Sequence, residues 1–150
     1  MGNIISGILT GVSGEYFVAA ELSRRGFISS VTLKNTKGID ILVTNEAASK
    51  FIGIQVKTNY GDRKSWLLNE KAENFHADNL FYAFVNLIGA EKLPEYYIVP
   101  SKVVADHIRN EHKKWLSTPG KKGQPHNDSP MRRFTDESQK YLNNWNILQL

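Results

Sequence analysis

The chain has 150 residues with 41% hydrophobic content, which predicts one globular domain spanning residues 1–150 with a core of its own. It contains no cysteine, which excludes disulfides, thiol catalysis and thiolate metal sites and suits a reducing, cytoplasmic location. The net charge of +4 favours an anionic partner such as nucleic acid, and no apolar run approaches the ~20 residues that cross a bilayer, so no membrane partner is expected.

Apolar residues near the N-terminus recur at three- and four-residue steps, which is typical of a helix. Glycines at positions 7, 11 and 14 weaken the first half of this pattern. We therefore expect a helix from about Ser13, a plausible N-cap, to Arg25, with Gly26 as its stop.

Three short strands are expected after this helix, separated by short polar links that suit antiparallel neighbours. They cover Ile28 to Lys34, Ile39 to Thr44, and Phe51 to Thr58. A short helix at about Asn69 to His76 comes next, followed by apolar strands at residues 80–88 and 95–100.

The last third of the chain begins with an amphipathic helix that Ser101 can cap and that runs to about Leu116. Residues 117–134 are rich in proline, glycine and lysine and predict a long basic loop. Residues 138–150 are apolar enough to dock back on the body of the domain.

Four polar side chains stand out because their predicted faces agree. Side chains alternate between the two faces of a strand, so Gln55 and Lys57 share one face of the third strand. Asp40 lies opposite the apolar face of the second strand. Glu15 is in phase with the buried side of the first helix, so all four converge if that helix crosses the sheet.

The chemistry of this group suits a hard divalent cation. Mg²⁺ prefers oxygen ligands and takes only one or two carboxylates, with water and substrate phosphate completing its shell; Mn²⁺ is the expected substitute. Asp40 would be the main ligand, Gln55 would supply an amide oxygen, and Glu15 would bind directly or through water. Lys57 would orient an attacking water or offset charge on a phosphate.

Each residue also has a simpler explanation. Asp40 fits a turn or strand end, and Lys57 fits an exposed edge strand on which lysine discourages aggregation. Gln55 is ordinary on a half-exposed strand, and Glu15 fits the first turn of a helix, where the dipole favours an acid. Their order and spacing favour the joint site.

The sequence here resembles the PD-(D/E)XK nuclease superfamily. The resemblance rests on Glu15 in GVSGEYFVAAELSRRGF, Asp40 in KGIDILV, and Gln55 and Lys57 in GIQVKT, and it covers about residues 11–99. The first two motifs are similar to those of archaeal Holliday junction resolvases, and the QxK variant is similar to Mrr-type restriction enzymes and to homing endonucleases of this fold. Two departures are Ile39 in place of proline before the aspartate and Gln55 in place of an acid.

The resemblance implies an α/β, restriction-endonuclease-like core in the order αβββαβ, with a mixed central sheet flanked by helices. It also implies metal-dependent hydrolysis of phosphodiester bonds in DNA. Because an amide replaces one carboxylate, metal binding should be weaker and depend more on Glu15.

Basic residues late in the chain are candidates for phosphate contacts, and a solvated surface loop is the equally good alternative. These candidates are Lys113, Lys114, Lys121, Lys122, Arg132 and Arg133, with Arg63 and Lys64 as a second group. Trp66 is expected in the core, and the four histidines have no spacing that suits a metal site.

Together these patterns predict a Mg²⁺-dependent endonuclease of double-stranded DNA, of homing or restriction type. Cutting both strands needs two active sites, so a homodimer or homotetramer is expected. The alternatives are a Holliday junction resolvase, a DNA-binding module of the same fold without catalysis, and an interaction domain with a coincidental motif.

Overall fold

The computed structural model describes residues 4–33 and 36–150. In chain order the elements are α1 (Gly7–Arg24), β1 (Ile28–Val31), β2 (Ile41–Thr44), β3 (Phe51–Tyr60), β4 (Ser65–Asn69), the 3₁₀ turn η1 (Glu70–Glu73), β5 (Leu80–Leu87), β6 (Glu95–Pro100), α2 (Ser101–Ser117), β7 (Met131–Thr135) and the 3₁₀ turn η2 (Trp145–Leu148). Within the described residues, no helix is both long and apolar enough to span a membrane.

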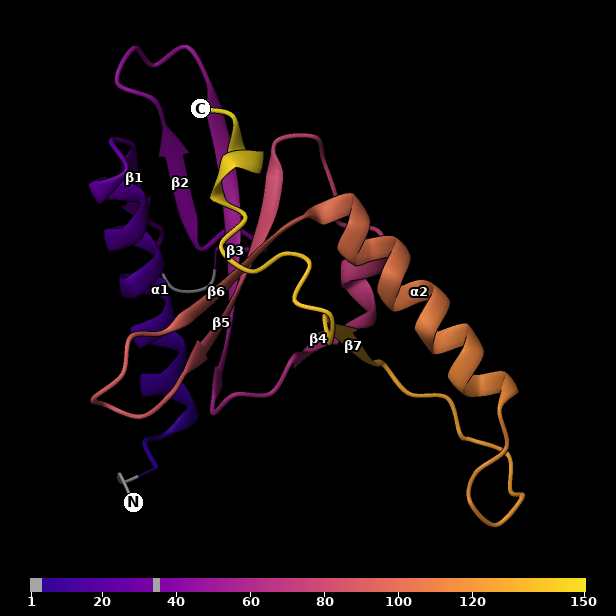
Figure 1. Ribbon diagram of the computed structural model, residues 1–150. Coiled ribbons are helices and arrows are strands. Elements are labelled where there is room, and N and C mark those ends of the chain that lie inside the picture. Colours follow the sequence, from indigo (N-terminus) through magenta and orange to yellow (C-terminus); the bar gives the residue numbers. More distant parts are fainter. Residues whose placement is uncertain (1–3, 34–35) are drawn as a thin grey trace.

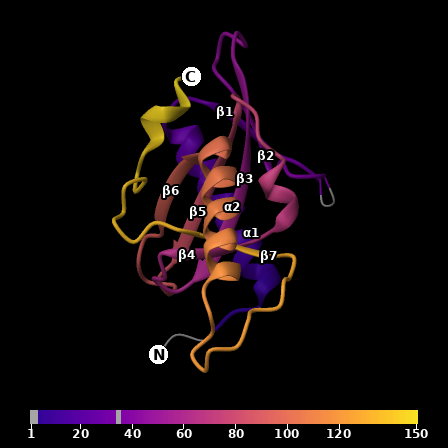
Figure 2. The same cartoon turned by 90° about the vertical axis from the view of Figure 1, so that its right-hand side faces the viewer.

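Five strands form the main sheet in the order β1-β2-β3-β5-β6. β3 and β5 run parallel, and the other neighbours are antiparallel, so the sheet is mixed. The two long helices lie on opposite sides of it, as the two views show, with α2 in front and α1 behind in Figure 2. The α/β fold with a mixed central sheet and the antiparallel β1-β2-β3 meander are therefore confirmed.

Apolar side chains form a core on each face of this sheet. On one face, Val18 and Leu22 of α1 and Trp145 and Leu148 near the C-terminus pack against the even-numbered residues of β3. On the other face, α2 and a separate two-stranded sheet of β4 and β7 cover the aromatic side chains of β5 and β6. The odd-numbered residues of β3 point to this second face, which determines where Gln55 and Lys57 lie.

The N-cap of helix α1 lies seven residues before the Ser13 N-cap that the sequence predicts. Ser6 is its N-cap and accepts a hydrogen bond from the backbone of Leu9, which stabilises the first turn. Gly14 is buried, and a Cβ on it would lie 1.8 Å from Oγ1 of Thr58. This glycine is therefore required by close helix–strand packing, and the prediction of a helix beginning at Ser13 was wrong.

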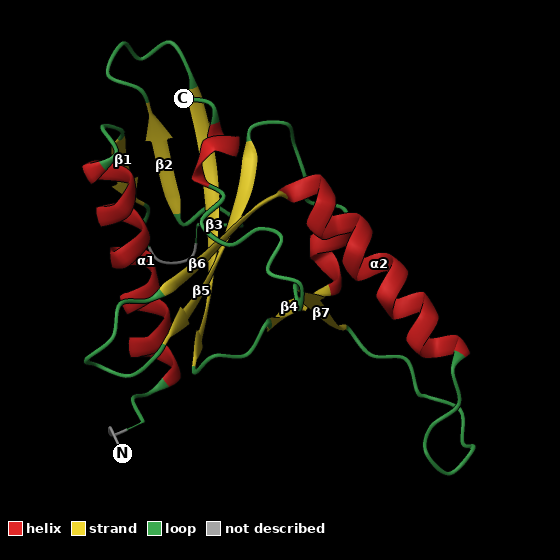
Figure 3. Ribbon diagram, in the orientation of Figure 1, coloured by secondary structure: helices red, strands yellow, loops and turns green. Residues whose placement is uncertain are grey.

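The predicted loop over residues 117–134 was too long, because Met131–Thr135 forms β7 and pairs with β4 across more than sixty residues of sequence. Figure 3 shows the remaining loop extending away from the end of α2. Neither five-residue strand was predicted. Three smaller corrections concern strand and helix ends: β1 ends at Val31, β2 begins at Ile41, and the expected short helix is a single 3₁₀ turn. Lys34, the predicted end of the first strand, lies outside the described residues.

Candidate functional site

Asp40, Gln55 and Lys57 lie on one face of the main sheet. Ile41 pairs with Ile54, so the preceding Asp40 stands opposite Gln55. The backbone of Asp40 donates to the carbonyl of Ile54 at 2.8 Å. Oδ2 of Asp40 accepts a hydrogen bond from the backbone of Val56 at 2.7 Å. Asp40 is thus fixed to β3 on both sides of Gln55, through its backbone at Ile54 and through its carboxylate at Val56.

A cavity of about 500 Å³ opens on this face of the sheet, and Asp40 itself does not line it. Gln55 and Lys57 both line it, and its other walls come from the turn before β2, the end of β4 and η1. Neither side chain makes a hydrogen bond or ion pair with another residue in the described part of the chain. Both are only partly buried, so an amide and an ammonium are available to a ligand in this cavity.

The turn before β2 is shaped by Gly38, which also lines the cavity. Its φ of +66° lies in the left-handed region, and a Cβ there would lie 2.3 Å from Cε1 of Phe75. Phe75 therefore packs directly on the glycine backbone two residues before Asp40. This contact packs η1 and the segment after it against the turn that leads into Asp40.

Tyr82 forms the floor of the cavity and is the cross-strand neighbour of Gln55 on β5. Burial, together with the charge of Asp40, raises the pKa of its phenol to about 12, so the hydroxyl keeps its proton at neutral pH. This hydroxyl is buried, and no hydrogen-bond partner lies within the described chain. A buried unsatisfied polar group is uncommon in folded proteins, and here it belongs to a residue that lines the cavity.

Glu15 comes from the helix that covers the opposite face of the sheet. It follows Gly14, which packs on Thr58, so Glu15 lies level with the end of β3 that contains Lys57. β2 pairs with β3 only as far as Ile54, whereas β3 continues to Tyr60. The sheet is therefore open on this side of β3, where α1 runs past, and Glu15 is half-buried there.

The side chains that could bind a metal ion at this site offer oxygen atoms and few negative charges. Across residues 4–33 and 36–150, no three or more histidine, cysteine, aspartate or glutamate side chains form a cluster that could hold a metal ion. Of the predicted oxygen ligands, the Asp40 carboxylate and the Gln55 amide share the second face of the sheet, whereas the Glu15 carboxylate belongs to the helix on the first face, so its place in a common site with them stays a prediction. Such a set fits Mg²⁺ or Mn²⁺, which keep several water ligands, better than a metal that needs a complete protein cage.

The sequence missed two cations at the same cavity. Lys37 and Lys71 both line it and are exposed. Lys37 lies in the turn before β2, and Lys71 lies in η1. In the sequence each is a lysine in a polar segment without a motif. Only the fold brings them to the same cavity as Lys57.

The basic residues predicted to contact phosphates separate into two groups. Lys113, Lys114, Lys121, Lys122, Arg63 and Arg133 are exposed. Lys64 instead forms an ion pair with Glu95 at 2.7 Å, and that hydrogen bond raises the pKa of its ammonium. Arg132 is only 7% exposed and bonds to Glu73 at 2.6 Å. Each side chain therefore has an acidic partner within the fold, and its role as a phosphate contact stays a prediction.

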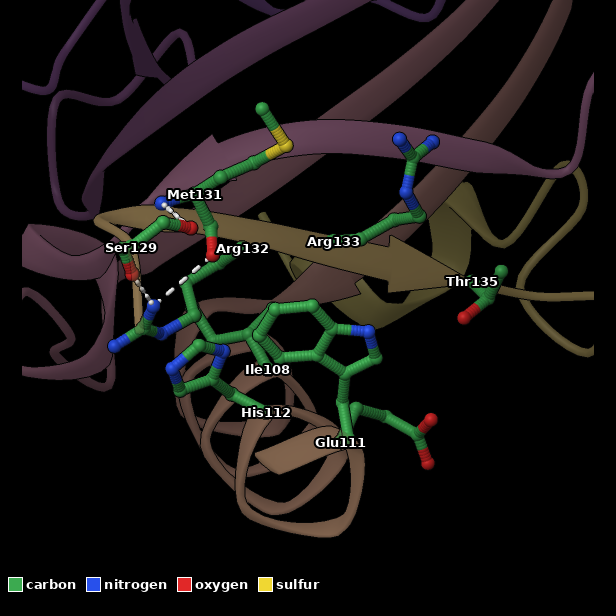
Figure 4. A pocket seen from close by; sticks show the side chains of 9 residues that line it. Ile108, Glu111, His112, Ser129, Met131, Arg132, Arg133 and Thr135 are labelled. Carbon is green, nitrogen blue, oxygen red and sulfur yellow. Dashed lines mark hydrogen bonds between the residues drawn. The ribbon is translucent and has the colours of Figure 1, made fainter. Parts of the chain in front are cut away.

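A second cavity of about 350 Å³ lies between α2 and β7 (Figure 4). His112 bonds to Asp128 there at 2.8 Å, and Trp115 stacks on both His112 and His126. These aromatic contacts attach the basic loop to the end of α2. Trp66, by contrast, is a core residue, as predicted.

Comparison with solved structures gives the same fold. The bacterial homing endonuclease I-Ssp6803I superposes with a TM-score of 0.57 and 16% sequence identity, over 97% of this chain and 94% of that one. The Holliday junction resolvase Hjc of Archaeoglobus fulgidus has a TM-score of 0.47 and 15% identity, over 87% and 86% of the two chains. No protein-family model and no curated protein sequence matches the chain. The likeness to I-Ssp6803I therefore agrees with the restriction-endonuclease-like fold predicted from the motifs, and the structure has that fold.

Proposed function

We propose that this protein is a divalent-metal-dependent endonuclease that hydrolyses phosphodiester bonds in double-stranded DNA, in the manner of a homing or restriction enzyme. The observation that carries this proposal is the fixed arrangement of Asp40, Gln55 and Lys57 on one sheet face. Asp40, whose carboxylate is held by the backbone of Val56, lies across from Gln55, and the Gln55 amide and the Lys57 ammonium line one cavity. The likeness to I-Ssp6803I, named as a homing endonuclease, supports this choice.

Different residues of the chain would bind the ion, the attacking water and the phosphates. Asp40 and Gln55, with Glu15, are the residues that would hold the ion, which would supply Lewis-acid activation of the scissile phosphate. Lys57 lies two residues beyond Gln55 on the same face. Its ammonium would hold the attacking water and offset the negative charge that grows on the phosphate. Lys37 and Lys71 at the rim would bind neighbouring phosphates.

Supercoiled plasmid provides the direct test. Incubation with Mg²⁺ or Mn²⁺ should convert it to nicked and linear forms, and a chelator should stop the reaction. Retarded migration of uncut DNA would instead support a DNA-binding module without catalysis. Branched DNA cut in preference to the plasmid would favour a junction resolvase, and no DNA affinity at low salt would exclude all three.

Restoring the missing acid should strengthen metal binding. We expect Gln55→Glu to lower the Mg²⁺ concentration for half-maximal cleavage on the order of tenfold, because one more negative charge faces the ion. Cleavage rates measured across a Mg²⁺ titration would show the shift. Gln149→Glu, an exposed substitution near the C-terminus, is the matched control. An unchanged titration for Gln55→Glu would remove Gln55 from the metal site.

We also propose that the enzyme acts as a homodimer, with α1 at the contact. The outer side of α1 exposes Ile8, Leu9 and Tyr16 at 72%, 55% and 65%, and residues 7–14 contain no charged side chain. An exposed apolar surface of this kind is typical of interaction sites. Because residues 7–14 carry no charge, a second copy can pack against this stretch around a two-fold axis without repulsion between like charges.

A charge placed on this surface should separate the subunits. We expect Leu9→Lys to change the mass measured by sedimentation from that of a dimer to that of a monomer. Nicking should persist while linear plasmid disappears, because each monomer has one site. Leu93→Lys, in the exposed loop between β5 and β6, should remain dimeric. A monomeric wild-type protein, or a dimeric Leu9→Lys variant, would refute the proposed contact.

A further inference from the structure

The two-stranded ribbon of β4 and β7 has one buried and one exposed face. Trp66 and Leu68 of β4 and Phe134 of β7 point into the core. The alternate residues point outward: Ser65, Leu67, Asn69, Met131, Arg133 and Thr135. Figure 4 shows Met131 and Arg133 on the same side of β7, with Arg132 on the other. The outer face therefore consists of a defined set of six side chains.

The chemistry of this outer face suits the edges of DNA bases. Arginine pairs with guanine, asparagine with adenine, and serine or threonine with either, while apolar groups contact the thymine methyl. The face presents one guanidinium, one amide and two exposed apolar chains, Leu67 at 51% and Met131 at 56%, whereas the hydroxyls of Ser65 and Thr135 are half-buried and bond to Arg133 and His107. It carries no acid that would repel phosphates. A two-stranded ribbon also has dimensions that the major groove admits.

The ribbon is rigid and lies beside the candidate active site. Trp66 packs on Phe84 with ring centres 5.1 Å apart, and Phe84 stacks on Phe134 at 4.7 Å. These contacts hold both strands against the main sheet through their buried face. Asn69, at the end of β4, lines the same cavity as Gln55 and Lys57. A duplex with a phosphate in that cavity would therefore meet the ribbon within the next few base pairs.

We propose that the outer face of the β4–β7 ribbon enters the major groove next to the scissile phosphate and determines sequence preference, with Arg133 as its main base contact. The inference rests on the proposed DNA cleavage and specifies how the target is chosen. Nη1 of Arg133 donates to Oγ of Ser65 at 3.2 Å. This bond holds an exposed guanidinium across the ribbon, in position for a bidentate contact to one guanine.

Selection of bound duplexes from a random-sequence library tests this proposal without requiring cleavage. Asp40→Asn protein serves as the non-cutting parent, and Arg133→Ala is added to it. The parent should select a defined sequence, and the Arg133→Ala variant should lose the preference for one guanine in each half-site. Affinity for the selected sequence should fall about tenfold or more, with little change for random DNA. Lys122→Ala is the control and should weaken binding to all sequences equally.

The outcomes separate the ribbon from the nuclease proposal. If Arg133→Ala selects the same sequence with the same relative affinities, the ribbon does not contact bases, although plasmid cleavage by the wild-type protein would stand. A parent that binds DNA with no sequence preference would also overturn the ribbon proposal. A protein that binds no DNA would refute both.

Discussion

Asp40→Asn and Lys57→Met should each lower the rate of DNA cleavage by at least about 10²–10³-fold, the usual cost of removing one group that stabilises developing charge. Asparagine keeps an oxygen that can accept the hydrogen bond from Val56, so the first variant loses the negative charge and not the local structure. Methionine keeps the length of the Lys57 side chain and removes its ammonium. Single-turnover cleavage measures the effect.

Binding must be separated from catalysis in these variants. Gel-shift affinity for the uncut duplex should change far less than the rate, because the exposed lysines that would hold the phosphates are retained. Asp78→Asn and Lys92→Met make the same chemical changes at exposed positions and should cleave at the wild-type rate. Cleavage by either site variant within about tenfold of wild type would contradict the assigned roles.

Arg132→Met should destabilise the protein by about 3–5 kcal/mol, because it leaves one partner of a buried ion pair without the other. Nε of Arg132 bonds to Glu73, and Nη1 donates to the carbonyls of Ser129 and Met131. Urea denaturation would measure the change in the free energy of unfolding. The neighbouring Arg133→Met substitution, on the exposed face, should change that free energy by no more than about 0.5 kcal/mol.

A double variant identifies the source of the loss. Arg132→Met combined with Glu73→Gln should be more stable than the sum of the two single effects, since no unpaired charge remains between η1 and β7. Equal stability of the Arg132→Met and Arg133→Met proteins would show that burial of this pair contributes little. The comparison also tests whether Arg132 and Arg133, which have the same predicted role in the sequence analysis, differ in their contribution to stability.

Local sequence patterns were sufficient to predict the arrangement of Asp40, Gln55 and Lys57. Alternation along β2 and β3 places these side chains on one face, and short polar links favour antiparallel pairing. Each inference depends on residues close together in the chain, and each agrees with the structure. The fold class followed from the same elements in order.

The features that the sequence did not predict depend on contacts between distant residues. β4 and β7 are short and have no partner until the chain folds, and their pairing fixes which of Arg132 and Arg133 is buried. Gly14 weakens a helix in isolation, yet Thr58 requires it. Phe75 and Tyr82 reach the cavity from segments that carry no motif. Packing partners of this kind are not encoded in local periodicity.

The hydrogen bond from the backbone of Val56 to Asp40 has an evolutionary consequence. A main-chain donor is present whichever amino acid occupies position 56, so substitutions there cannot remove it unless they introduce proline. Substitutions in the neighbouring strand other than proline at position 56 therefore leave the hydrogen bond to the aspartate in place. Position 55 can exchange an acid for an amide while the aspartate stays in place, because the hydrogen bond to Asp40 comes from the backbone of Val56 and not from the side chain at position 55.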